Sequence, residues 1–122
     1  MKCLIADDSQ IIRMVLAKIF SNFGFEVDVA EDGDEVIEKC FASEPDIVIM
    51  DWWLPVIDGI DVLYKIRNDK RIRQPRIVFC SSNTAPDKIA EALQGGADDY
   101  LMKPFDEDII KSKLIILGLL KE

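Results

Sequence analysis

The stretch Ile47-Val48-Ile49-Met50-Asp51 places four consecutive apolar residues directly before an aspartate. An apolar run without polar alternation is typical of a β-strand that is buried on both faces, as in a parallel sheet. Three more short apolar runs, at residues 3–6, 77–80 and 100–102, also end at polar side chains. The sequence therefore predicts buried parallel strands with reactive groups at their carboxyl ends.

Segments with strand-like and helix-like periodicity alternate five times along the chain, which predicts an α/β fold. The stretch Phe25-Glu26-Val27-Asp28-Val29 alternates apolar and acidic residues, as expected of an edge strand with one solvated face. We expect one domain over residues 1–122, with a doubly wound parallel sheet and helices on both faces. The expected strands are 2–6, 25–29, 47–51, 76–81 and 99–102, and the expected helices are 9–22, 34–43, 58–68, 86–94 and 106–120.

Composition excludes several classes of function. The net charge of −8 over 122 residues argues against a nucleic-acid-binding surface and against docking on anionic lipid. No apolar run approaches the roughly 20 residues of a transmembrane helix, and no signal peptide is visible. Cys3, Cys40 and Cys80 lie in apolar segments, which favours buried reduced thiols in a cytoplasmic protein. The chain has no histidine, which excludes Ser-His-Asp chemistry and a histidine base.

Polar residues follow four of the expected strands: Asp7 and Asp8, Asp51, Ser81, and Lys103. In open α/β sheets the carboxyl ends of the strands form the edge where ligands bind. Three carboxylates at that edge repel one another unless a cation neutralises them, and Mg²⁺ takes carboxylates together with phosphate oxygens. The pattern therefore favours a magnesium site beside a phosphoryl group, although Asp7-Asp8 alone is more typical of a helix N-cap and a solvated acid.

Each remaining group has a role that suits phosphoryl chemistry. Asp51 is the candidate nucleophile, because a carboxylate can accept a phosphoryl group as an acyl phosphate. Ser81 could donate a hydrogen bond to a phosphoryl oxygen. Lys103 is costly at the end of an apolar strand without an anionic partner, and a cis bond to Pro104 would aim it inward. After Asp51, Pro55 and Gly59 shape a loop that could turn a main-chain carbonyl toward a metal.

From Lys2 to about Leu120 the chain resembles the receiver domain of bacterial two-component response regulators. The motifs occur in order and at compatible spacing, and together they are highly specific. They are Leu4-Ile5-Ala6-Asp7-Asp8-Ser9, Asp51-Trp52-Trp53-Leu54-Pro55-Val56-Ile57-Asp58-Gly59, Cys80-Ser81-Ser82, and Gly96-Ala97-Asp98-Asp99-Tyr100-Leu101-Met102-Lys103-Pro104-Phe105.

The resemblance implies the flavodoxin-like strand order 2-1-3-4-5 and a Mg²⁺ site. Asp8, the Asp51 side chain and the main-chain carbonyl of Trp53 would bind the ion, and Asp7 would act through a metal-bound water. The resemblance also implies a phosphoryl donor, either a sensor histidine kinase or a phosphotransfer protein. Trp53 is bulky for its position in the family, so the lifetime of the phosphorylated state is expected to differ.

Asp51 would be the phosphoacceptor, and Ser81 and Lys103 would hold the phosphoryl oxygens. Tyr100 would swing inward when Ser81 moves toward the phosphate, and a downstream protein would recognise the change. Ser81 stands where threonine is more frequent in the family, which keeps the hydroxyl and loses a methyl. The chain would assist its own phosphorylation and dephosphorylation without being an enzyme in the usual sense.

Three other interpretations are open. An aspartate-nucleophile phosphatase of the haloacid dehalogenase type usually needs Asp-x-Asp after the first strand, which Asp7-Asp8 does not supply. A flavodoxin-like cofactor binder needs a hydroxyl- and glycine-rich phosphate loop, and two aspartates there would repel the phosphate. A degenerate receiver used as a scaffold would have lost site residues, whereas all of them are present. Output would use protein contacts if the chain is complete, or an effector domain if it is a fragment.

The last expected helix carries more apolar residues than one sheet face can bury. Ile110, Leu114 and Leu117 form one stripe. A second stripe beside it consists of Ile109, Ile116 and Leu120, and a further apolar side consists of Ile115 and Leu119. Exposed apolar surface of this size marks interaction sites, so we expect a partner or homodimer surface on this helix. The resemblance implies that the fourth helix, fifth strand and fifth helix form the output face.

Overall fold

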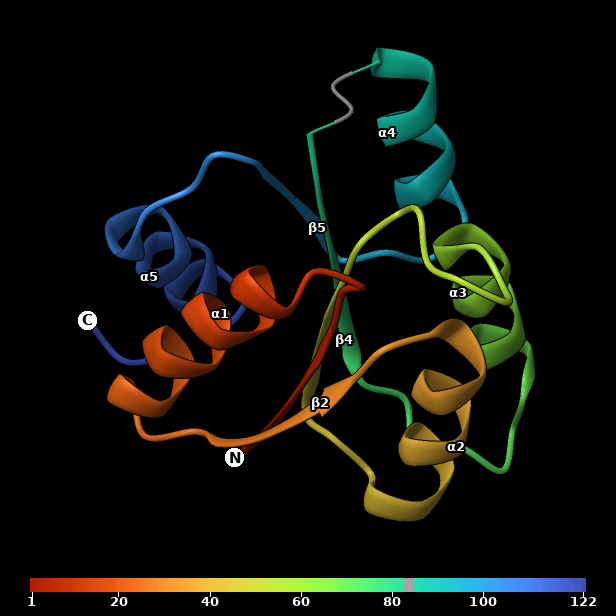
Figure 1. The fold of residues 1–122 in the computed structure, drawn as a ribbon, viewed down its shortest axis with the longest axis horizontal. Coiled ribbons are helices and arrows are strands. Elements are labelled where there is room, and N and C mark those ends of the chain that lie inside the picture. Colours follow the sequence, from red (N-terminus) through yellow and green to blue (C-terminus); the bar gives the residue numbers. More distant parts are fainter. Residues whose placement is uncertain (83–84) are drawn as a thin grey trace.

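Five parallel strands form one sheet in the order β2-β1-β3-β4-β5 in the computed structural model, which describes residues 1–82 and 85–122 (Figure 1). The strands are β1 (Lys2–Ala6), β2 (Glu26–Ala30), β3 (Ile47–Met50), β4 (Arg76–Ser81) and β5 (Asp99–Met102). The helices are α1 (Gln10–Asn22), α2 (Gly33–Ser43), α3 (Gly59–Asn68), α4 (Pro86–Gln94) and α5 (Glu107–Ile116). These bounds confirm the sequence predictions to within one residue, except at the end of α5.

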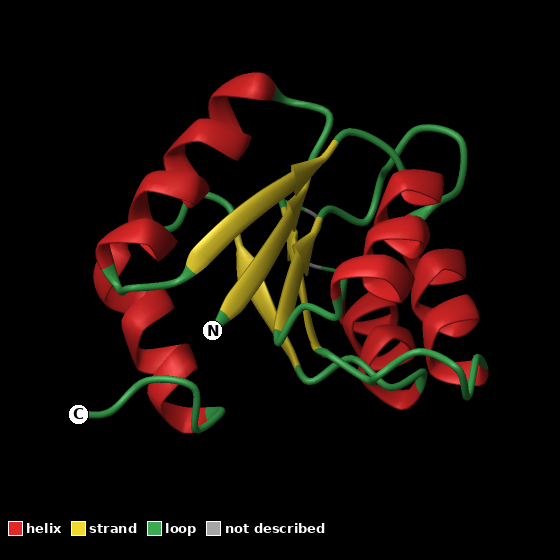
Figure 2. Ribbon diagram, turned by 90° about the horizontal axis from the view of Figure 1, so that it is seen from below, coloured by secondary structure: helices red, strands yellow, loops and turns green. Residues whose placement is uncertain are grey.

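Two layers of helices enclose the sheet, as Figure 2 shows. The alternating side chains of the strands divide into two apolar clusters. Leu16 and Phe20 of α1 and Ile110 of α5 pack on one face, and α2, α3 and α4 pack on the other. All four residues of β3 are buried, because both faces of this central strand are covered. β2 alternates exposed and partly buried residues at one edge of the sheet, as its sequence pattern predicted.

The strand register aligns the carboxyl ends that carry the site. Ala6 at the end of β1 lies beside Met50 at the end of β3. Ser81 at the end of β4 lies beside Met102 at the end of β5. The polar residues that follow or end these four strands therefore emerge at the same edge of the sheet.

The last helix ends earlier than its apolar periodicity predicted. The N–H of Gly118 donates to the Ile115 carbonyl and that of Leu119 to the Leu114 carbonyl, and Gly118 has a φ of 76°. These bonds form a Schellman cap, which favours glycine at its left-handed position. The expectation that the helix reaches Leu120 is therefore wrong.

The chain after this cap folds back toward the core. Leu119 and Leu120 pack against the α1–α5 side of the core. Ile115 is also partly buried, so the further apolar side formed by Ile115 and Leu119 is partly covered. The exposed apolar residues of α5 are Ile109 and Ile116.

Helix α3 begins in direct contact with the backbone that follows β3. A Cβ added at Gly59 would lie 2.5 Å from the Asp51 carbonyl oxygen and 2.8 Å from the Phe79 ring. The N–H of Gly59 also donates to the Trp52 carbonyl at 2.7 Å. Only glycine allows this close approach, which fixes the loop behind Asp51.

We predict that Gly59→Ala lowers the free energy of unfolding by about 2 kcal/mol, because the methyl group overpacks the end of β3. Helix propensity alone predicts the opposite sign, a gain of up to about 1 kcal/mol. Urea denaturation measures the difference. Ser112→Ala, at an exposed position of α5, is the control and should change stability by no more than about 0.5 kcal/mol. A stabilised Gly59→Ala protein would contradict the close contact.

Candidate functional site

Three aspartates converge at the carboxyl edge of the sheet. Asp7, Asp8 and Asp51 each place one carboxylate oxygen so that the three oxygens lie within 4.8 Å of one another. Asp7 is buried, Asp51 is partly buried and Asp8 is exposed. Adjacent strands β1 and β3 bring the three residues together, as the sequence pattern predicted.

The ammonium of Lys103 lies between two of these carboxylates. Its Nζ is 2.8 Å from Asp7 Oδ2 and 3.2 Å from Asp51 Oδ2. The Lys103 N–H donates to the carbonyl of Ser81 at 3.0 Å, which ties the end of β5 to the end of β4. The Lys103–Pro104 peptide bond is cis and the side chain points into the site, as the sequence suggested.

Burial and charge oppose each other at Lys103 and Asp51. Burial disfavours the Lys103 ammonium, but Asp7 and Asp51 outweigh it, so the pKa of Lys103 lies above its ordinary value. Burial raises the pKa of Asp51; Lys103 acts against that rise and the charge of Asp7 adds to it. The Lys103 pairing stabilises the fold below the ordinary lysine pKa of about 10.4 and is lost as pH rises through the raised pKa.

Asp7 is fixed by contacts with the start of α1. Its Oδ1 accepts the N–H of Ser9 at 2.9 Å, and its carbonyl accepts from the guanidinium of Arg13 at 2.7 Å. Ser9, and neither aspartate, is the N-cap of α1, because its hydroxyl accepts the N–H of Ile12. The N-cap interpretation of Asp7-Asp8 is therefore wrong, and both carboxylates remain available to the site.

Ser81 ends β4 as a buried hydroxyl, between the strands that lead to Asp51 and Lys103. Tyr100 of β5 forms a side-chain hydrogen bond with Ser81. Burial raises the pKa of the Tyr100 phenol, and the bond to Ser81 acts in the opposite direction. Ser81 and Tyr100, which the family resemblance predicts to move together, are thus in contact.

The loop after Asp51 runs close to its carboxylate. The N–H of Trp53 donates to Asp51 Oδ1 at 3.3 Å. Further along, Val56 has a φ of 71°, which is unusual for a β-branched residue. The sequence pointed to Pro55 and Gly59 as the residues that shape this loop, and Val56 carried no signal of its conformation.

The donor set fits a small, hard divalent cation. Mg²⁺ binds oxygens at about 2.1 Å in an octahedron, so its opposing ligands lie about 4.2 Å apart. The three carboxylate oxygens lie within 4.8 Å of one another, which is compatible with ligation of one such ion. Cys80, which precedes Ser81, is a buried thiol whose pKa is raised to about 12 by burial, so it stays protonated and is no competing ligand.

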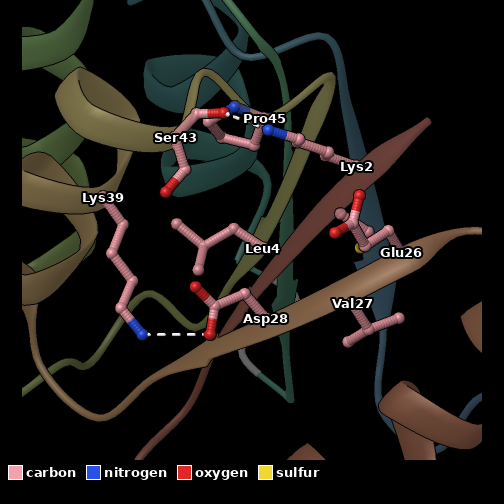
Figure 3. Close-up of a pocket in the computed structure, with 9 residues that line it drawn as sticks. Lys2, Leu4, Glu26, Val27, Asp28, Lys39, Ser43 and Pro45 are labelled. Carbon is pink, nitrogen blue, oxygen red and sulfur yellow. Dashed lines mark hydrogen bonds and ion pairs between the residues drawn. The ribbon is translucent and has the colours of Figure 1, made fainter.

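A separate hollow of about 210 Å³ lies between β2 and α2, near the amino ends of the strands (Figure 3). Three of its charged groups already have partners: Lys39 contacts Asp28 at 3.1 Å and the Val29 carbonyl at 2.6 Å, and Lys2 donates to the Ser43 carbonyl. These pairings leave few free groups to recognise a ligand, so the acidic cluster is the stronger candidate.

Residues 3–115 match the family model of the response regulator receiver domain. The chain belongs to this family. Among its relatives, this receiver domain is 34% identical over 121 residues to chemotaxis protein CheY1 of Helicobacter pylori, covering 97% of this chain and 98% of that one. It is 38% identical over 108 residues to chemotaxis protein CheY of Bacillus subtilis, covering 88% of each chain.

Solved structures of receiver domains share the fold. A two-component response regulator from Clostridium difficile superposes with a TM-score of 0.89 at 29% identity, covering 100% of this chain and 99% of that one. The receiver domain of sensor histidine kinase PA1611 from Pseudomonas aeruginosa has a TM-score of 0.83 at 26% identity, covering 93% of each chain. That structure holds a magnesium ion in its active-site cleft. Within residues 1–82 and 85–122, no helix is long and apolar enough to span a membrane.

We predict that Lys103→Met, in the absence of divalent cations, lowers the free energy of unfolding by about 2–4 kcal/mol. The substitution leaves the buried carboxylate of Asp7 without a cation. Lys113→Met is the matched control, because Lys113 pairs with Asp99 at 3.2 Å, the distance from Lys103 to Asp51, but in a more exposed setting. It should cost no more than about 1 kcal/mol. Equal losses for both variants in chemical denaturation with EDTA would contradict the dependence of Asp7 on Lys103.

Proposed function

We propose that this receiver domain is a phosphorylation-switched signalling module that accepts a phosphoryl group on Asp51. The observation that carries the proposal is the convergence of three carboxylates on one ammonium, with Lys103 2.8 Å from Asp7 and 3.2 Å from Asp51. We take residues 1–122 as a single receiver domain, because both core clusters share one sheet. The phosphoryl donor is a sensor histidine kinase or a phosphotransfer protein, and such donors place the chain in the cytoplasm.

Asp51 supplies the nucleophile. One oxygen of its carboxylate attacks the phosphorus, a new bond between phosphorus and oxygen forms, and the bond between phosphorus and the donor's nitrogen breaks. Asp8, Asp51 and the main-chain carbonyl of Trp53 would hold Mg²⁺, with Asp7 acting through a bound water. When bound, Mg²⁺ neutralises the charge on the carboxylates and the phosphoryl oxygens.

Lys103 and Ser81 hold the product. The Lys103 ammonium already sits at the nucleophile, so it can turn from Asp7 to a phosphoryl oxygen with a small movement. Ser81 can donate its hydroxyl to another phosphoryl oxygen. Because Tyr100 is hydrogen-bonded to Ser81, movement of the hydroxyl would be transmitted to the phenol on β5. The domain thus assists its own phosphorylation and dephosphorylation.

The readout surface consists of α4, β5 and α5. Large apolar side chains are exposed on all three elements: Leu93 on α4, Met102 on β5 and Ile109 on α5. They lie on the elements that follow Ser81 and flank Tyr100, so a shift in this region would change the surface that a protein partner or a second copy contacts.

We predict that acetyl phosphate with Mg²⁺ adds a single phosphoryl group, detected as one mass increment in intact-protein mass spectrometry. Asp51→Asn should take up none, because it removes the nucleophile. Lys103→Ala should keep metal binding and be phosphorylated more slowly. Phosphorylation of Asp51→Asn to the wild-type level would refute Asp51 as the acceptor.

The metal requirement is tested separately. Millimolar Mg²⁺ should raise the melting temperature of the wild type, because it relieves repulsion among the carboxylates. Asp8→Asn should reduce both that shift and the rate of phosphorylation. Asp61→Asn, at an exposed position of α3, is the matched control and should behave as the wild type. An equal Mg²⁺-induced shift in Asp8→Asn would exclude Asp8 as a ligand.

We predict that phosphorylation increases self-association through the α4–β5–α5 surface, measured by sedimentation velocity with and without acetyl phosphate. The double variant Met102→Gln with Ile109→Gln should abolish the increase while still being phosphorylated. Ile11→Gln, at an exposed position of α1, should retain it. Loss of the increase in Ile11→Gln but not in the double variant would move the interface to α1.

A further inference from the structure

Lys88 of α4 reaches the loop that follows Asp51 and contacts both of the chain's tryptophans. Its Nζ lies 5.0 Å from the ring centroid of Trp52 and 5.1 Å from that of Trp53. Both distances are within the range of cation–π attraction, for which tryptophan is the best aromatic partner. The side chain forms no ion pair with any residue that the structure describes. Among those residues, its ammonium therefore faces two indole rings and no carboxylate.

The two indoles differ in how firmly they are held. Trp52 is 3% exposed and packs against Phe79 with ring centroids 5.1 Å apart, so it is part of the core. Trp53 is 53% exposed. The ammonium therefore links an exposed, solvent-facing ring to a buried one. A lysine that only needed solvation could extend into water instead.

The position of Trp53 makes this attachment relevant to Asp51. Asp51 follows β3, and Lys88 lies on the helix after the neighbouring strand β4. An indole that begins two residues after Asp51 and contacts Lys88 must extend from the end of β3 toward α4. The ends of the adjacent strands β3 and β4, where a phosphoryl group on Asp51 would meet the hydroxyl of Ser81, border that path.

We propose that Lys88 is a positioning residue that holds the indole of Trp53 over the approach to the phosphoryl group, so that the position of α4 sets how long the group persists. The inference rests on the proposed function of Asp51. In hydrolysis a water oxygen attacks phosphorus in line, the acyl bond from phosphorus to Asp51 breaks, and inorganic phosphate and the free carboxylate result. A fixed indole crowds this water, and a released indole admits it.

The test compares the loss of the phosphoryl group in four proteins. Each is labelled with acetyl phosphate and Mg²⁺, the donor is removed, and the decay is followed by intact-protein mass spectrometry. Lys88→Met keeps the aliphatic stem and removes the charge, and it should lose the label about threefold faster than the wild type, as a cation–π contact of this strength implies. Lys88→Arg keeps the cation and should match the wild type. Lys65→Met, on the exposed face of α3, should also match it.

A Trp53→Asn background shows whether Lys88 acts through the indole. Trp53→Asn alone should decay faster than the wild type, and adding Lys88→Met should accelerate it no further. An unchanged rate in Lys88→Met overturns the proposal. Equal acceleration with and without Trp53, or acceleration by Lys65→Met, also overturns it.

Acrylamide quenching of tryptophan fluorescence separates this proposal from the proposed function, because it needs no phosphorylation. Trp52 is buried, so the quenchable emission comes from Trp53. Lys88→Met should increase quenching, and Lys88→Arg should not. If no protein takes up the label, the function of Asp51 fails and the lifetime role fails with it. If labelling succeeds and quenching is unchanged in Lys88→Met, Lys88 does not hold the indole and only this inference is overturned.

Discussion

The ammonium of Lys103 is the charge that allows the rest of the site to exist. Two carboxylates about 4 Å apart repel each other by about 4 kcal/mol even at an effective dielectric constant of 20. The fold nevertheless brings three together, and one of them, Asp7, is buried. One ammonium among three carboxylates leaves a formal charge of −2, which a divalent cation can balance. The site therefore keeps a net negative charge that Mg²⁺ would neutralise.

The backbone around the site keeps these charges from relaxing apart. Ser9 and Arg13 hold Asp7 on both its carboxylate and its carbonyl, so it cannot turn away from Lys103. On the other side, the carbonyl of Asp51 lies against Gly59, where no side chain fits. The parallel register adds the last constraint, because it fixes the ends of β1 and β3 at the same level. Packing thus fixes the positions and electrostatics then determines which ligand the positions suit.

Sequence patterns predicted what depends on local periodicity and failed where a contact joins distant segments. The continuous apolar run at 47–50 identified a central strand, and Pro86 marked the first residue of α4, because both signals lie within the element itself. At the C-terminus the apolar repeat continues past Gly118, but the left-handed conformation of this glycine ends the helix. The sequence pattern did not predict the contact of Lys88 with the tryptophans, because a lysine on a polar helix face is ordinarily solvated.

Two contacts lead away from the site of Asp51, that of Ser81 with Tyr100 and that of Trp53 with Lys88, and they differ in the free energy that they can transmit. On the proposed function, a phosphoryl group on Asp51 would bring a charge of about −1.5 to −2, and its bonds to Ser81 and Lys103 would be charge-assisted, so they could reverse an equilibrium between two conformations. The contact of Lys88 with Trp53 is worth about 0.5–1 kcal/mol at an exposed ring. A ligand shifts an equilibrium only by its differential affinity for the two states. In the proposed mechanism the Ser81–Tyr100 contact would therefore act as the switch, whereas Lys88 would only adjust the lifetime of the phosphorylated state, by a factor of about 2 to 5.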